Sequence, residues 1–193
     1  MPEFVYHWLP ILAVLAVFGE RMREVFAKRQ TVQGTKQETL TFNLFMFCGL
    51  FMVGGGITEY LLRGLVLSWP IFLPGVLISV ASFAVRRAAI QALGRFWSLH
   101  VEMREGHEFV TTGPFAYARH PVYFSMILEH TGIALILGAW FSFGIVLLVF
   151  IPTLIARVRI EEQALVAQFG EAYRSYMKAT PAIVPGLGGR RTA

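Results

Sequence analysis

Long apolar runs separated by short polar segments make up most of the chain, and they predict five membrane-spanning helices. The predicted spans are residues 3–20, 40–62, 65–85, 121–138 and 141–158. A bilayer core about 30 Å thick needs roughly 20 helical residues, which the second and third spans satisfy and the first just reaches. The last apolar run is too long for one crossing, and its middle contains Gly138 and Gly144. We interpret it as two helices joined by a tight turn, so the fold class is an all-α integral membrane protein whose last two helices form a hairpin.

The positive charges follow the same division. With five crossings, 16 of the 17 Lys and Arg residues fall on one side of the membrane and only Arg63 on the other. Because cytoplasmic loops are rich in Lys and Arg, we expect the N-terminus outside the cytoplasm and the C-terminus inside. An even number of crossings would break this separation. Residues 1–193 then form a single membrane domain, with cytoplasmic segments at 86–120 and 157–180.

Composition supports a membrane protein. The 193 residues are 55% hydrophobic and 15% charged, against about 25% charged in a typical soluble domain. This excludes a disordered chain and an ordinary soluble enzyme, and a single cysteine, Cys48, excludes a disulfide scaffold. The net charge of +5 is explained by the cytoplasmic loops, so no nucleic-acid partner is expected and no obligate protein partner is indicated. Charged Glu20-Arg21 after the first apolar run also speaks against a cleavable signal peptide.

The candidate chemistry begins in the segment before the fourth span. Gly113-Pro114 marks a turn, and Pro121 suits the first turn of a helix because its missing N–H would have no helical partner there. His120 is then expected at the helix N-terminus, where free amides can hold an anionic or carbonyl group. Arg119, His120 and Tyr123 would meet at one place on the membrane surface. Anchoring of lipid phosphates is the alternative interpretation of the basic residues.

The segment after the fifth span adds two carboxylates. Arg157 and Glu161 share a helix face, whereas Glu161 and Glu162 differ by about 100°, so at most one of them can point into a shared pocket. A carboxylate there could accept a hydrogen bond from an ammonium group or a ribose hydroxyl; a solvated helix end is the alternative. No histidines lie at metal-ligand spacing, so no metal site is expected.

Together these elements resemble a known family. Its motifs here are His107-Glu108-Phe109-Val110 before Gly113, then Arg119-His120-Pro121-Val122-Tyr123, and finally Glu161-Glu162. The combination resembles the isoprenylcysteine carboxyl methyltransferase family, within a wider group that includes phospholipid N-methyltransferases. The resemblance covers roughly the C-terminal half. It implies methyl transfer from S-adenosylmethionine to a lipophilic acceptor in the membrane, above all the carboxylate of an isoprenylcysteine.

The resemblance also implies residue roles. Arg157 would orient the substrate. The cofactor would bind in a cytoplasmic pocket to His107, Glu108, Phe109, Val110, His120, Pro121, Val122, Tyr123 and Glu161, with Arg119 and Glu162 as further candidates. The chain departs from the family pattern at Ser125, where glycine is common, and at Phe115, where eukaryotic members have a tyrosine hydroxyl.

Two ionisable residues inside the fourth span allow more than one kind of methyl acceptor. Glu129 and His130 are costly to place in a membrane and are therefore functional candidates. Glu129 is the candidate catalytic residue, since an amine acceptor would need a base, although an interhelical hydrogen bond would also explain it. The alternatives are a phospholipid or small-amine N-methyltransferase, an NADPH-dependent membrane lipid or sterol reductase, and a non-catalytic lipid-binding protein. Against the reductase, Phe124-Ser125-Met126 stands where such enzymes continue with Gly-Glu.

Overall fold

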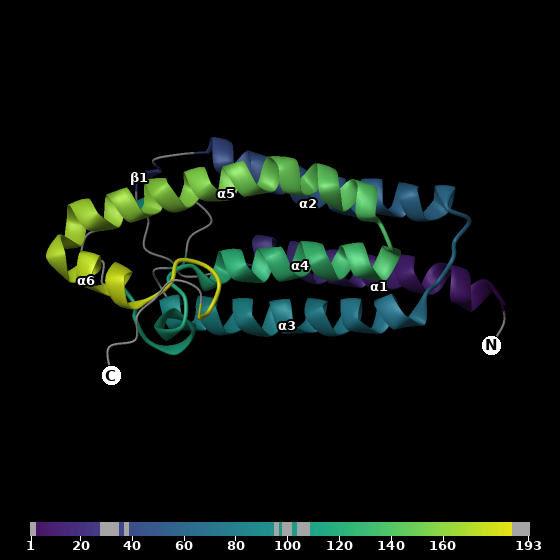
Figure 1. Cartoon of the computed structure of the whole chain (residues 1–193), viewed down its shortest axis with the longest axis horizontal. Coiled ribbons are helices and arrows are strands. Elements are labelled where there is room, and N and C mark those ends of the chain that lie inside the picture. The colour runs from purple at the N-terminus through teal and green to yellow at the C-terminus, as the bar shows by residue number, and fades with distance from the viewer. Residues whose placement is uncertain are drawn as a thin grey trace.

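The chain folds into an elongated helical bundle (Figure 1), seen in a computed structural model that describes residues 3–27, 35–36, 39–94, 97, 102–103 and 109–186. The elements in chain order are α1 (Glu3–Phe26), β1 (Thr35–Lys36), α2 (Leu40–Leu62), α3 (Trp69–Leu93), β2 (Glu102–Met103), the 3-10 helix η2 (Gly113–Ala116), α4 (Pro121–Leu137), α5 (Trp140–Phe169) and α6 (Glu171–Ala179). The two short strands pair antiparallel, with Thr35 opposite Met103 and Lys36 opposite Glu102.

The helices lie nearly parallel to one another and place the candidate segments at one end. In Figure 1, α2 and α5 run together along one side, α3 runs along the other, and α1 and α4 lie between them. The α2–α3 and α4–α5 connections are at the end with the N-terminus. The opposite end carries η2, the start of α4, the end of α5, α6 and the C-terminal segment. The two segments that carry the motifs are therefore neighbours in space.

Several helices extend beyond the apolar runs that predicted them. α3 ends at Leu93 rather than residue 85, and α5 continues to Phe169 rather than ending at 158. The added turns contain Ala, Gln, Glu and Arg, which are good helix formers, and each helix ends only where a glycine takes positive φ, at Gly94 and Gly170. α3 also begins later than predicted, at Trp69, because Gly64 and Leu65 both have positive φ and turn the chain.

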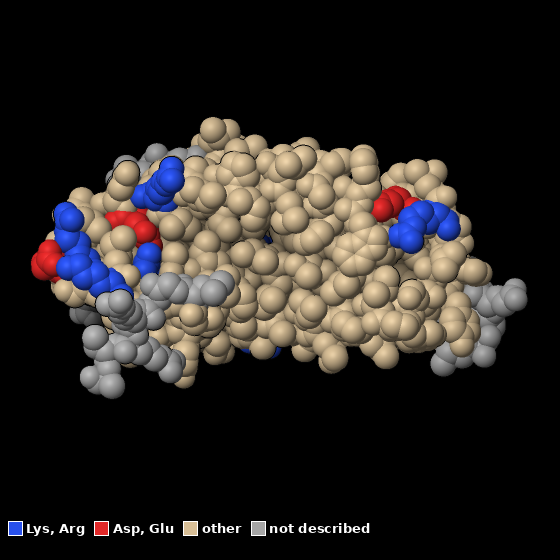
Figure 2. Space-filling model, viewed as in Figure 1, with Lys and Arg blue, Asp and Glu red and all other residues tan. Residues whose placement is uncertain are grey.

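The surface of the bundle is that of a membrane protein. Among the described residues, α2, α3 and α5 are long and apolar enough to cross a membrane, and α4 is a shorter apolar helix of 17 residues. Large apolar side chains face outward, including Leu77 at 69% and Leu148 at 77% exposure, as expected for contact with lipid. Figure 2 shows charged side chains gathered at the two ends of one face, with an uncharged band between them. Length and composition thus support three crossings, where the sequence predicts five.

The predicted tight turn between the last two spans is confirmed. α4 ends at Leu137 and α5 begins at Trp140, with Gly138 in the left-handed conformation at φ 62°. Both helix ends are held by α2: Arg63 Nη1 donates to the carbonyl of Gly138, and the Glu59 carboxylate accepts from the amide of Ser142 at 2.8 Å. The carboxylate lies at the partially positive N-terminus of α5 and the guanidinium at the partially negative C-terminus of α4, and both interactions are favourable.

Small residues bring α3 and α4 into close contact. A Cβ atom at Gly75 would lie 2.7 Å from the backbone nitrogen of Ile136, and one at Gly132 would lie 2.3 Å from Ser79 Oγ. Only glycine allows this approach of two helix backbones. The contact fixes α4 against α3 and so fixes the direction in which the α4 N-terminus, with its candidate residues, points.

Candidate active site

The start of α4 is held by the residues that follow α6. α4 begins at Pro121 with His120 as its N-cap residue, as the sequence predicts. The amide of Arg119 donates to the carbonyl of Pro181 at 2.9 Å, and the amide of His120 donates to that of Ala182 at 2.8 Å. Arg119 Nη1 donates to the carbonyl of Met177 at 2.8 Å. The C-terminal segment therefore sets the position of both basic residues.

Glu162 binds these basic residues. Its Oε1 atom accepts from Arg119 Nε at 2.8 Å and lies 2.7 Å from Arg119 Nη2. The same oxygen lies 3.1 Å from His120 Nε2. With three nitrogen partners, this oxygen has no capacity left for a ligand.

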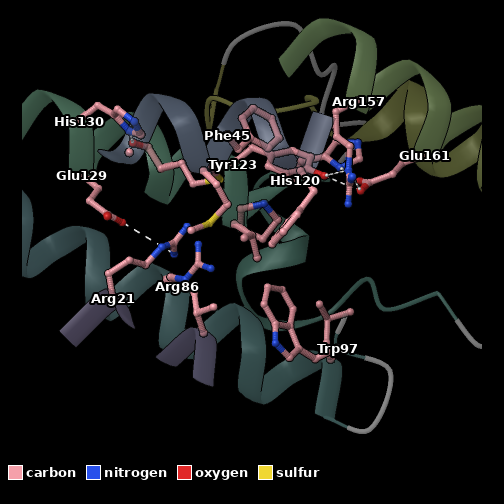
Figure 3. A pocket seen from close by; sticks show the side chains of 18 of the residues that line it. Arg21, Phe45, Arg86, Trp97, His120, Tyr123, Glu129, His130, Arg157 and Glu161 are labelled. Atoms are coloured by element: carbon pink, nitrogen blue, oxygen red, sulfur yellow. Dashed lines mark hydrogen bonds and ion pairs between the residues drawn. The ribbon is translucent and has the colours of Figure 1, made fainter. Parts of the chain in front are cut away.

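Glu161 is bonded differently. Its Oε1 atom accepts from the hydroxyl of Tyr123 and from Arg157 Nε, the latter at 3.1 Å. Among the described residues, its Oε2 atom has one ion-pair partner, His120 Nδ1 at 3.4 Å. Arg157 also donates from Nε to the Tyr123 hydroxyl at 3.1 Å and from Nη1 to Thr41 Oγ1 at 2.9 Å. We call the set Arg119, His120, Tyr123, Arg157, Glu161 and Glu162 the carboxylate network; Figure 3 shows part of it.

His120 carries a proton within this network. Both ring nitrogens face carboxylate oxygens, and each contact is favourable only if that nitrogen bears a hydrogen. Burial alone would lower the pKa of His120, but its hydrogen bonds to Glu161 and Glu162 and their negative charges outweigh burial, and the net pKa is raised. The fold therefore favours the imidazolium form of His120, which joins the two glutamates.

The raised pKa of His120 predicts a pH-dependent stability. The contribution of the imidazolium is complete below about pH 6.5, the ordinary pKa of histidine, and is lost as the pH rises through the raised value in the folded protein. We expect the melting temperature of detergent-purified protein to fall over this range, and to fall less in His120→Gln. NMR of ring-labelled histidine should show His120 titrating above 6.5; a value below 6.5 would contradict the network.

A cavity of about 230 Å³ opens beside the network (Figure 3). Its walls have three kinds of residue. One part is polar and comes from the network: Arg119, His120, Tyr123, Arg157 and Glu161. A second part is apolar and comes from α1 and α2, and includes Phe18, Met22, Phe42, Met46, Leu50 and Val53. A third, polar part lies farther from Glu161: Arg21, Arg86, Glu129 and His130.

The structure brings most of the candidate residues to this cavity. Pro121 and Val122 line it together with the network residues, and so does Glu129. Of the adjacent glutamates, only Glu161 lines the cavity, as their 100° offset on the helix predicts. Glu129 lies 3.8 Å from Arg21 Nη1 through its Oε2 atom, and its assignment as a catalytic residue stays a prediction.

In the predicted cofactor-binding stretch, residues 107–110, the described residues differ from the other candidate residues in their position relative to the cavity. His107 and Glu108 lie outside the described residues. The ring of Phe109 packs 5.0 Å from that of Phe169 and 5.5 Å from that of Tyr173. Neither Phe109 nor Val110 is among the described residues that line the cavity, so their role toward a cofactor also stays a prediction.

The aromatic side chains of α6 connect this stretch to η2. The Tyr176 hydroxyl donates to the carbonyl of Phe115 at 2.5 Å. Burial raises the pKa of Tyr176 to about 12, so it remains a donor at physiological pH. Phe115 is buried and lines the cavity, and its backbone carbonyl makes the polar contact with Tyr176.

Sequence reasoning overlooked three polar residues. Arg21 and Arg86 were counted only as loop charges, and Thr41 was treated as part of an apolar span. Arg86 is 2% exposed because α3 continues two turns beyond its apolar run. The signal that could have revealed this is the uninterrupted helix-forming sequence from Val85 to Leu93. Among the residues that the structure describes, no group of three His, Cys, Asp or Glu residues could hold a metal ion.

Comparison with known proteins agrees with the geometry. Residues 75–167 match the isoprenylcysteine carboxyl methyltransferase family. The matched segment is just under half of the chain, and through it the chain is similar to that family. The matched segment runs from α3 to α5 and contains His120, Tyr123, Arg157 and both network glutamates, whereas α1 and α2 lie outside it.

Individual relatives extend the picture. The chain is similar to the protein-S-isoprenylcysteine O-methyltransferase of Schizosaccharomyces pombe, with 32% identity over 103 residues that cover 52% of this chain and 44% of the relative. It is also similar to the uncharacterized protein YpbQ of Bacillus subtilis, with 29% identity over 82% of this chain and 95% of the relative. A methanethiol S-methyltransferase of Crocosphaera subtropica is 26% identical over 85% of this chain and 72% of its own length. The chain thus spans about half the length of the curated isoprenylcysteine methyltransferases it matches.

Proposed function

We propose that the protein transfers a methyl group from S-adenosylmethionine to a lipophilic acceptor that enters the cavity from the membrane, and that the acceptor is the carboxylate of an isoprenylcysteine. One observation carries this proposal. Glu161, a partly buried glutamate of the matched segment, lies at the polar end of a cavity whose α1 and α2 walls are apolar. Such a cavity suits a charged cofactor at one end and an alkyl chain at the other.

The residues around Glu161 fit this cofactor. The Glu161 side chain is 21% exposed, and within the part of the chain that the structure describes its Oε2 atom has a single ion-pair partner at 3.4 Å. This oxygen therefore has acceptor capacity toward the cavity. Ammonium and ribose hydroxyl groups are donors that such an oxygen would accept. Glu161, His120 and Tyr123 would hold the cofactor together with Pro121 and Val122 of the first α4 turn, while Arg119 and Glu162 fix His120.

The remaining work of the chain is positioning and exclusion of water. The cofactor supplies a methyl sulfonium, and as an ionised acceptor oxygen forms the new O–C bond the S–C bond breaks, so both charges are lost and no base is needed. The side chains of α1, α2 and α4 around the cavity keep water away from the acceptor and limit its orientations.

Arg157 acts on the network in this proposal. The resemblance assigned it to the substrate, but its Nε donates to Tyr123 and Glu161 and its Nη1 donates to Thr41. A guanidinium with these bonds orients the glutamate and the tyrosine. We therefore assign Arg157 as a positioning residue.

The proposal includes five crossings. α1 has 24 residues and α4 has 17, and both lie alongside the three long apolar helices in the bundle (Figure 1). The predominance of Lys and Arg in the loops of one side supports a cytoplasmic position for the end that carries α6 and the carboxylate network. S-adenosylmethionine would be available there.

A thiol is the second candidate acceptor. It is favoured by the methanethiol S-methyltransferase relative, whose match covers 85% of this chain. A thiol or amine acceptor must lose a proton before transfer. Glu129 and His130 line the cavity and would be the groups that receive it.

Calorimetric titration of detergent-purified protein with S-adenosylmethionine, S-adenosylhomocysteine and NADPH tests the proposal. We expect saturable binding of both adenosyl compounds and none of NADPH. Transfer of a radiolabelled methyl group to N-acetyl-S-farnesylcysteine, methanethiol or an amine lipid then identifies the acceptor. If the protein binds only NADPH, the proposed activity is wrong and a reductase takes its place. If the methyl group is transferred only to methanethiol, the proposed acceptor is a thiol and not a carboxylate.

A further inference from the structure

We propose that Arg21 and Arg86, which we call the guanidinium pair, bind the carboxylate of the methyl acceptor. This inference rests on the proposed methyltransferase function and adds a binding site to it. Both arginines line the cavity, and Figure 3 shows them on the opposite side of His120 and Tyr123 from Glu161. They come from α1 and α3, and Arg21 lies outside the segment that matches the family.

The pair is held by carboxylates from two helices. Glu24 Oε1 accepts from Arg86 Nε at 2.5 Å and lies 4.0 Å from Arg21 Nη1. Glu129 Oε2 lies 3.8 Å from the same Arg21 nitrogen. The two longer distances exceed hydrogen-bond length, so these glutamates neutralise Arg21 without forming a hydrogen bond to its Nη1 atom.

Each arginine has a buried nitrogen whose hydrogen-bonding capacity is unused. Within the described residues, the Nη1 atoms of Arg21 and Arg86 are buried and have no hydrogen-bond partner. A buried donor without a partner is unfavourable. A ligand that accepts hydrogen bonds in the cavity that both arginines line would relieve this cost.

The chemistry of these donors selects the ligand. The two carboxylates balance the two positive charges, and what the cluster lacks is acceptor atoms. A carboxylate brings two acceptor oxygens that match the fork of guanidinium N–H groups. An ammonium group would bring donors to nitrogens that can only donate. Both guanidinium groups belong to residues that line the cavity, so a carboxylate bound there would lie beside them.

The surroundings accommodate the rest of an acceptor. Phe18 and Met22 on α1 and Met46 and Leu50 on α2 line the same cavity, and Phe18 and Met22 lie within one turn of Arg21 on α1. An alkyl chain attached to the carboxylate would therefore lie against apolar side chains. The other two arginines of the cavity have partners already. Arg157 donates to Tyr123, Glu161 and Thr41, and Arg119 donates to Glu162 and to the carbonyl of Met177. The guanidinium pair is therefore better placed for this task.

Binding of a charged and an uncharged acceptor to the same protein tests the inference. The probes are N-acetyl-S-farnesylcysteine and its carboxamide, titrated into full-length protein loaded with S-adenosylhomocysteine. We expect the wild-type protein to prefer the acid by about tenfold to a hundredfold. Arg21→Gln and Arg86→Gln should reduce this preference to about twofold or less, with the affinity for S-adenosylhomocysteine changed by less than about twofold.

Matched variants separate binding from folding. Arg87→Gln removes an exposed arginine next to Arg86 whose partner is Glu20 at 3.2 Å, and should keep the full preference. Arg21→Lys and Arg86→Lys keep the charge but not the fork, and should keep part of the preference. If the Gln variants do not fold, the acid-to-amide ratio of the Lys variants decides.

The outcomes separate this inference from the proposed function. Equal affinity of the wild-type protein for acid and amide, with methyl transfer intact, overturns the guanidinium pair as the carboxylate site. A second result would also overturn it: the Gln variants lose affinity for S-adenosylhomocysteine but keep the preference for the acid. The guanidinium pair would then bind the cofactor. The same titration is repeated with phosphatidylglycerol added. If this anionic lipid abolishes the preference for the acid, the guanidinium pair binds a lipid phosphate instead. Failure of the wild-type protein to bind S-adenosylhomocysteine contradicts the proposed function itself.

Discussion

Glu161→Gln is expected to weaken the binding of S-adenosylmethionine and S-adenosylhomocysteine at least about a hundredfold. The substitution keeps the size of the side chain and removes its charge. It thereby weakens the bonds from Tyr123 and Arg157 and replaces one acceptor oxygen by a donor that would face a bound ammonium or hydroxyl group. Hydrogen bonds to a charged partner contribute about 1.5–3 kcal/mol each, and losing two of them corresponds to about a hundredfold or more in affinity. Calorimetry on detergent-purified protein measures the effect.

The control for this variant is Glu171→Gln. Glu171 is 73% exposed at the start of α6, so its substitution changes the net charge of the same end of the molecule without touching the cavity. Both variants should elute from size exclusion as the wild-type protein does. Unchanged affinity in Glu161→Gln would falsify the assignment of Glu161 to the cofactor.

Arg157→Ala is expected to lower the free energy of unfolding by about 3–5 kcal/mol and to abolish S-adenosylhomocysteine binding. Removing one partner of a buried ion pair leaves the other charge uncompensated, and losses of this size are typical. Here the side chain of Arg157 is 4% exposed and its bonds reach Tyr123, Glu161 and, on α2, Thr41. Denaturant titration and calorimetry on the same preparation measure both effects.

Two further variants identify the cause. Arg159→Ala removes an exposed arginine two residues away on α5 and should leave stability and binding unchanged. Arg157→Lys keeps a point charge but cannot bond to three partners in the geometry of a guanidinium, so it should recover part of the stability. A variant that keeps its stability and cofactor affinity, and loses only affinity for the acceptor, would return Arg157 to the substrate role that the family resemblance implies.

The features that the sequence predicted correctly depend on local chemistry. Two glycines and uncharged aromatic residues in one apolar run indicated the turn between α4 and α5. Pro121, which has no backbone N–H group, indicated where α4 begins. The orientation of Glu161 relative to Glu162 followed from helix geometry alone. Each of these needed only a few neighbouring residues.

The features that escaped prediction depend on contacts between distant parts of the chain. A change from apolar to charged residues marks the edge of a hydrophobic segment and not the end of a helix, so α3 and α5 were predicted too short. For the same reason Arg86 was assigned to a loop, although α3 carries it into the cavity. The partners of Arg119 in α6 and directly after it are 58 or more residues away, and no local pattern indicates them.

The backbone bonds from Arg119 and His120 to Pro181 and Ala182 have a consequence for synthesis of the protein. The apolar segments of α4 and α5 can enter the membrane as soon as they leave the ribosome, but His120 receives its backbone partner only after residue 182 has been added, 62 residues later. Insertion of the apolar segments and fixing of the His120 backbone therefore depend on different parts of the chain. A chain that ends a few residues before Pro181 would keep every apolar segment and lack both backbone bonds.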